Sequence, residues 1–123
     1  MDKRSDLAFD GYQLAQRLAA ATNHELDQLE FGVVEMNLAG TVLRYNKTES
    51  DHSGLLPERV VGRYFFLIIA PCCNNSQVAH RYAGAAVDET VKFTFALRSK
   101  HCPVTLRLLK DASAKRMYLL VRW

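Results

Sequence analysis

The amino-acid sequence predicts an α+β domain: a five-stranded antiparallel sheet with helices on one face and a helical cap at the N-terminus. Three observations predict this class. Five short segments alternate apolar with polar residues, which is typical of strands that bury one face. Apolar residues at helical spacing precede the first strand, and an irregular stretch with glycines and prolines separates the second strand from the third.

Residues 11–30 predict the helical cap, in which a second short helical turn follows the first helix and Asn23 serves as its cap. The apolar residues at helical spacing are Leu14, Leu18, Ala19, Leu26 and Leu29. Two strands are expected next, over residues 31–36 and 41–45. The turn over residues 37–40 joins them as a hairpin.

The middle of the chain, residues 46–73, is irregular and predicts short helices and loops. One of these helices is expected from Pro57 through Val61, because proline suits the first turn of a helix. Ser76 is placed to cap a longer helix over about residues 77–88. The apolar stripe of this longer helix would consist of Val78, Tyr82, Ala85 and Ala86.

Three more alternating segments, VKFTFALRS, PVTLRLLKD and MYLLVRW, predict three strands joined as antiparallel hairpins. Their connections are expected at residues 100–102 and 112–115. The resulting order of helix, two strands, short helices, helix and three strands is that of a PAS domain, which encloses a small ligand pocket. This architecture does not define a function by itself.

Length and composition predict a single domain over residues 1–123, with the cap in residues 1–30 and the PAS core in residues 31–123. The hydrophobic share of 49% and the charged share of 24% are those of an ordinary globular protein. The net charge is only +3 and the basic residues are scattered, so no nucleic-acid partner is expected. No signal peptide or membrane span is recognisable, which predicts a cytoplasmic protein without membrane contact.

The three cysteines, Cys72, Cys73 and Cys102, match neither a disulfide framework nor the ligand spacing of a zinc site. We expect reduced thiols. A free cysteine is more often a buried small apolar residue than a functional group, so a functional role has to be supported by the surrounding sequence.

Four stretches of the chain, LEFGVV, VLRYNKTESDHSG, PERVVGRYFF and APC, resemble the photoactive yellow protein family. These blue-light receptors carry p-coumaric acid as a thioester on the cysteine of an Ala-Pro-Cys motif. The likeness extends from Leu26 to Trp123 and is densest from Phe31 to Cys72. Its most specific part combines Tyr45 and Glu49 with Phe65-Phe66 and the motif Ala70-Pro71-Cys72.

The resemblance implies that Cys72 is the attachment point and that Tyr45 and Glu49 donate hydrogen bonds to the phenolate of the pigment. A buried anion needs such partners, and burial would keep the Glu49 carboxyl protonated. Ser53 stands where the family usually has threonine and is expected to support Tyr45. The residues expected to wall the pocket are Val34, Phe65, Ile69, Ala70 and Phe95.

The resemblance also implies a signalling mechanism without an enzymatic reaction. Light isomerises the pigment, Glu49 gives up its proton, and the buried carboxylate destabilises the fold, with partial unfolding of the N-terminal cap as the signal. The output would pass to an unidentified signalling protein or through a homodimer.

Three alternatives remain beside this interpretation. Leu55 stands where the family has an arginine and favours a PAS module without a pigment, which would regulate by dimerisation or by sensing a small ligand. His80 or His101 would suit haem or a metal ion, but a single histidine is weak support. A thiol enzyme built on Cys72 lacks a local motif. No role is assigned to Cys73 or Cys102.

Overall fold

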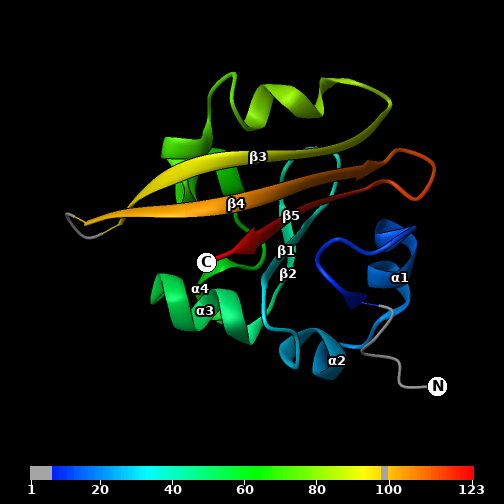
Figure 1. Cartoon of the computed structure of the whole chain (residues 1–123), viewed down its shortest axis with the longest axis horizontal. Coiled ribbons are helices and arrows are strands. Elements are labelled where there is room, and N and C mark those ends of the chain that lie inside the picture. The colour runs from blue at the N-terminus through cyan, green and yellow to red at the C-terminus, as the bar shows by residue number, and fades with distance from the viewer. Residues whose placement is uncertain (1–6, 98–99) are drawn as a thin grey trace.

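The structure, a computed structural model, describes residues 7–97 and 100–123 (Figure 1). Residues 1–6 of the expected cap therefore lie outside the described residues, as do residues 98–99, the last two of the expected strand VKFTFALRS. In chain order the elements are α1 (Leu14–Ala20), α2 (Asn23–Asp27), β1 (Gly32–Met36), β2 (Val42–Tyr45), α3 (Lys47–Ser53), α4 (Pro57–Val60), a π-helix η2 (Phe65–Ile69), the 3-10 helices η3 (Pro71–Cys73) and η4 (Ala79–Ala83), β3 (Ala86–Leu97), β4 (Lys100–Asp111) and β5 (Arg116–Arg122).

The five strands form one antiparallel sheet in the order β2-β1-β5-β4-β3 (Figure 1). The first hairpin places β1 between the edge strand β2 and the central strand β5, and Val34 of β1 lies opposite Tyr45 of β2 on one side and Leu119 of β5 on the other. This arrangement confirms the predicted α+β fold with a five-stranded antiparallel sheet.

Two apolar clusters cover the two faces of the sheet, because successive side chains of a strand point to opposite faces. The first cluster packs alternate residues of β1, β4 and β5 against the segment from α4 to η4. The second packs the intervening residues of the same strands, such as Val33, Leu109 and Leu120, against the N-terminal segment. The candidate site lies in the first cluster, and the N-terminal cap covers the opposite face.

The cap consists of α1 and α2, as predicted, but Asn23 is not the residue that caps the second helix. Thr22 is the N-cap: its hydroxyl accepts a hydrogen bond from the amide of Glu25, whose carboxylate accepts one from the amide of Thr22. This reciprocal pair is a capping box. The threonine one residue earlier is favoured because Glu25 stands three residues after it.

The predicted helix over residues 77–88 is wrong. Only Ala79–Ala83 is helical, as a short 3-10 helix, and β3 already begins at Ala86. Asn75, not Ser76, receives the amides at the start of this segment, those of Gln77 and Val78. The predicted apolar stripe ended at Ala86, which instead begins the long strand β3, and pairing with β4 outweighs the helical spacing.

Residues 100–102 were expected to connect two strands but belong to β4, where His101 pairs with Ala96 and Cys102 with Phe95. Two other expectations are confirmed. Helix α4 begins at Pro57, and residues 112–115 form the turn before β5. Among the described residues, no helix has the length and apolar character needed to cross a membrane.

Candidate functional site

Tyr45 and Glu49 meet where β2 ends and α3 begins. Tyr45 is the last residue of β2, Asn46 caps α3, and Glu49 lies in its first turn. The four-residue spacing thus spans a strand end and a helix start. Both side chains are buried, and the Glu49 carboxyl contributes to raising the pKa of Tyr45, so the two groups lie within electrostatic reach.

Asn46 holds this junction in place through four hydrogen bonds. Its Oδ1 accepts from the amides of Val33 (2.9 Å) and Glu49 (3.1 Å), and its Nδ2 donates to the carbonyls of Leu26 (2.8 Å) and Phe31 (3.1 Å). A buried side-chain amide with every polar atom paired fixes backbone positions strongly. Sequence analysis did not single out this residue, because its bonds go to backbone groups of distant elements.

Glu49 carries the most perturbed carboxyl of the site. Its side chain is 4% exposed, and burial raises its pKa to about 7, while a hydrogen bond from Trp123 acts in the opposite direction. The carboxyl lies directly over Gly32 of β1: a Cβ at that position would stand 1.9 Å from Glu49 Oε1. The glycine at position 32 therefore leaves room for the Glu49 carboxyl. With its raised pKa, this carboxyl is largely protonated below neutral pH.

Tyr45 is held from the other side by Ser53. The Tyr45 hydroxyl donates to Ser53 Oγ at 2.8 Å, and the same Oγ accepts the amide of Leu55 at 3.1 Å. Burial, with the Glu49 carboxyl as a second cause, raises the pKa of Tyr45 well above its usual value. The tyrosine is therefore a neutral O–H donor throughout the physiological pH range. Leu55 itself is exposed.

The motif Ala70-Pro71-Cys72 places two neighbouring thiols in opposite surroundings. On the short helix η3, Cys72 is exposed and Cys73 is fully buried, with their Sγ atoms 3.9 Å apart. Burial raises the pKa of the Cys73 thiol far above its usual range, so this cysteine stays protonated. Cys73, to which the sequence assigned no role, is thus a member of the first apolar cluster.

The structure brings the five expected wall residues together. They all belong to the first apolar cluster, three fully buried and two packed at its edge, and this cluster also contains Tyr45. In chain order these residues are Val34, Phe65, Ile69, Ala70 and Phe95. Of the residues predicted for the site, Cys72 is the one whose side chain lies at the surface.

Trp123 completes the site, and sequence analysis missed it. Its indole Nε1 donates to Glu49 Oε1 at 2.8 Å. Its ring stacks on His52 with centroids 4.9 Å apart and planes 8° apart, and the ring of Phe95 lies 5.3 Å away on another side. The only available signal was that this is the single tryptophan of the chain.

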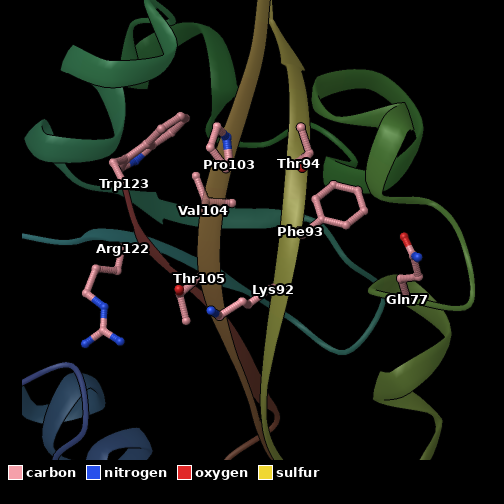
Figure 2. A pocket seen from close by; sticks show the side chains of 9 residues that line it. All are labelled: Gln77, Lys92, Phe93, Thr94, Pro103, Val104, Thr105, Arg122 and Trp123. Carbon is pink, nitrogen blue, oxygen red and sulfur yellow. The ribbon is translucent and has the colours of Figure 1, made fainter.

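Trp123 also borders a surface pocket of about 780 Å³ beside β3, β4 and the end of β5 (Figure 2). The ring in Figure 2 extends from the end of β5 away from the basic side chains of Lys92 and Arg122. The full lining consists of Gln77, Lys92, Phe93, Thr94, Pro103, Val104, Thr105, Arg122 and Trp123. Trp123 therefore stands between this pocket and the buried carboxyl of Glu49.

The histidines considered for haem or a metal ion, His80 and His101, are both exposed. Within the described part of the chain, no three His, Cys, Asp or Glu side chains gather as metal ligands would. The arrangement that the structure does form is a buried pair of neutral O–H groups, from Tyr45 and Glu49, under an apolar wall. Two such donors suit a buried oxyanion such as a phenolate.

Known proteins resemble this chain along most of its length. A photoactive yellow protein of Halochromatium salexigens is 32% identical over 118 residues, which cover 93% of this chain and 94% of that protein. The crystal structure of the photoactive yellow protein domain from the sensor histidine kinase Ppr of Rhodospirillum centenum matches with a TM-score of 0.82 and 30% identity, over 88% of this chain and 98% of that one.

The PAS architecture is found in a more distant structure as well. The PAS domain of an HTR-like protein from Haloarcula marismortui matches with a TM-score of 0.62 and 16% identity, over 88% of this chain and 95% of that one, which supports the fold alone. No protein-family model matches the chain.

Proposed function

The chain belongs to the photoactive yellow protein family, and we propose that it is a blue-light receptor that carries p-coumaric acid as a thioester on Cys72. The observation that carries this proposal is the buried pair of Tyr45 and Glu49, whose raised pKa values favour the protonated forms and which lie within electrostatic reach of each other, Tyr45 in the first apolar cluster. A buried carboxyl of this kind is costly for a fold, and such sites are often functional.

The two thiols of the motif support Cys72 as the attachment point. Thioester formation requires a thiolate that an activated acyl donor can reach, and the thiolate is the reactive form of cysteine. Cys73 is buried and its raised pKa keeps it a thiol, whereas Cys72 is exposed to solvent. Of the two neighbours, Cys72 is the one that meets the chemical requirement.

At the other end of the site, Tyr45 and Glu49 would hold the phenolate oxygen of the bound group. When bound, the p-coumaroyl group supplies blue-light absorption and photoisomerisation. For the Tyr45 hydroxyl to donate to the phenolate, its bond to Ser53 would reverse, with the Ser53 hydroxyl donating to Tyr45 while Ser53 Oγ still accepts the Leu55 amide. Val34, Phe65 and Phe95 exclude water from these bonds, because they are buried in the same cluster.

The signal would follow from the proton that Glu49 releases. A buried carboxylate without a partner costs several kcal/mol, against a domain stability of roughly 5 to 15 kcal/mol. Helix α3, which carries Glu49, is tied to the N-terminal cap: Asn46 Nδ2 donates to Leu26 O, the Lys47 amide to Asp27 Oδ1, and the Thr48 hydroxyl to Leu29 O. A strained α3 would therefore loosen the cap. A partner protein or a second copy of the chain would recognise the loosened state.

A second candidate is a PAS module that works without a pigment, as a dimerisation or small-ligand domain. The observations that favour it are the surface position of the Cys72 thiol and the exposed Leu55 at the place of the family's arginine. Both candidates share the fold and differ in whether Cys72 becomes acylated.

Reconstitution with an activated ester of p-coumaric acid separates the two candidates. Intact-protein and peptide mass spectrometry should find one p-coumaroyl group per chain, on the peptide that contains Cys72, and Cys72→Ala should abolish it. Cys73→Ala is the matched control and should retain the adduct. A chain that remains unmodified, or one that loses the adduct only in Cys73→Ala, would contradict attachment at Cys72.

A further inference from the structure

Trp123 approaches Glu49 because of the register between β1 and β5. Val121 of β5 lies opposite Gly32 of β1, and residues two apart on a strand share a face, so the side chain of residue 123 is directed to the face where Glu49 covers Gly32. There the indole Nε1 donates to Glu49 Oε1 at 2.8 Å. The contact joins the end of the last strand to the first turn of α3.

The ring of Trp123 is held on two sides. It stacks nearly parallel on His52, one turn along α3 from Glu49, and it packs at 53° to the ring of Phe95 on β3. The carboxyl of Glu49 lies against Gly32 of β1, where an added Cβ would stand 1.9 Å from Oε1. Both the donor and the acceptor of this bond are therefore fixed by packing.

The chemistry of the two groups then assigns the carboxyl oxygens. An indole N–H can only donate, so the oxygen that faces it has to act as an acceptor. We propose that Trp123 is a positioning residue for Glu49, which fixes Oε1 as the accepting oxygen and leaves Oε2 to carry the proton that the site exchanges. This inference rests on the proposed function, since it concerns the donor that the photoreceptor would use.

The same bond matters more once Glu49 has lost its proton. A hydrogen bond to a charged acceptor is about twice as strong as one between neutral groups, so the indole stabilises the carboxylate more than the acid. The hydrogen bond from Trp123 accordingly lowers the pKa of Glu49 against the larger effect of burial. Trp123 thus moderates the cost of the buried anion.

Few other groups that face Glu49 titrate near neutral pH. Tyr45 at the end of β2 and Cys73 on η3 both have pKa values raised far above the neutral range by burial. His52 contacts the indole rather than the carboxyl. A test of the inference has to separate Glu49 from His52.

The test uses the full chain without added pigment, so that its outcome does not depend on the proposed function. Infrared spectra between pH 5 and 9 follow the C=O stretch of the Glu49 carboxylic acid, which is assigned by its loss in Glu49→Gln. Trp123→Phe keeps an aromatic ring but removes the donor. We expect its midpoint to rise by about one pKa unit and its C=O stretch to move to higher wavenumber.

The control is His52→Phe, which keeps a stacked ring on Trp123 and should leave the C=O frequency in place. An unchanged midpoint in Trp123→Phe, or a shifted midpoint with an unchanged C=O frequency, would overturn the inference, because the indole would then act only through packing. Loss of the titration in His52→Phe would overturn it as well.

A second measurement avoids the Trp123 variant altogether. In the His52→Phe background, where no stacked imidazole can contribute, the fluorescence of the single tryptophan should titrate with the midpoint of the carboxyl band, and it should not respond to pH once Glu49→Gln is added. Equal titration in both proteins would overturn the inference. Failure to bind p-coumaric acid would contradict the proposed function but leave this result standing.

Discussion

At the scale of single residues, the energetics of the site depend mainly on the buried carboxyl of Glu49. Its carboxyl is buried against Gly32 and receives one hydrogen bond, from Trp123. One bond does not replace the hydration that a carboxylate loses on burial, so burial raises the pKa of Glu49 to about 7 and the neutral acid is the favoured form below that pH. This preference is what makes the group a proton donor.

The raised pKa of Glu49 predicts how stability depends on pH in the chain without pigment. Between about pH 4.5 and 7 the folded state binds a proton that the unfolded state has lost, so the free energy of unfolding falls as the pH rises. The loss attributable to Glu49 should be about 3 kcal/mol across this window, with none above it. Urea denaturation at a series of pH values measures it.

Glu49→Gln is the reference for this measurement, because glutamine is neutral at every pH and keeps the size of the side chain. The difference in the free energy of unfolding between the unmodified chain and Glu49→Gln should become smaller as the pH is lowered toward 4.5. Parallel curves for the two proteins would show that the carboxyl does not titrate differently in the folded and unfolded states.

Residue by residue, the sequence revealed the groups that carry the motif and missed those that support it. Tyr45, Glu49 and Ser53 were recognisable because their types and spacing are specific. Asn46 and Trp123 act through long-range contacts 13 to 74 residues away along the chain, which no local pattern shows. The contrast between Cys72 and Cys73 depends on the direction of each side chain on η3, which an irregular segment does not reveal in advance.

At the scale of elements, two arginines fasten the N-terminal cap to the sheet. Arg44 on β2 donates to the carbonyls of Leu18 (2.9 Å) and Ala21 (2.7 Å) while paired with a glutamate of β1. Arg107 on β4 donates to the carbonyls of Phe9 and Gly11, both at 2.9 Å. The cap is therefore held by a few charge-assisted bonds in addition to its apolar contacts, and loosening these bonds would release it.

Arg107→Lys should weaken the cap selectively. A lysine ammonium does not reproduce the planar fork that reaches both Asp88 and the carbonyls of Phe9 and Gly11. Hydrogen–deuterium exchange should become roughly tenfold faster in residues 7–31 and stay unchanged in β1 and β5.

Arg81→Lys is the matched control for the cap experiment, because Arg81 pairs with Glu89 at an exposed site away from the cap. Exchange in the cap should be unaffected in this variant. Equal acceleration over the whole sheet in Arg107→Lys would mean that the arginine supports the fold in general rather than the attachment of the cap.

The elements that sequence analysis predicted well are those with a clear local pattern. The first hairpin, α4 and the last three strands follow alternation or proline placement directly. The helix expected over residues 77–88 failed because its alanines fit a strand as well as a helix, and long-range pairing with β4 decided the outcome. The connection expected at residues 100–102 failed for the same reason.

At the scale of the whole molecule, the sheet separates the site from the element that would transmit its signal. The first apolar cluster with Tyr45 lies on one face, and the cap lies on the other (Figure 1). Helix α3 connects the two, because it carries Glu49 and bonds to the cap through Asn46, Lys47 and Thr48. Charge created on one face can thereby affect packing on the other.

The central claim is that this chain senses blue light through a pigment on Cys72. The most direct measurement is the absorption spectrum of the chain reconstituted with activated p-coumaric acid, recorded in the dark, under blue light and during recovery. We expect a blue or near-ultraviolet band that bleaches and returns, and that Cys72→Ala lacks. A band that survives in Cys72→Ala, or a bound pigment that does not respond to light, would contradict the claim.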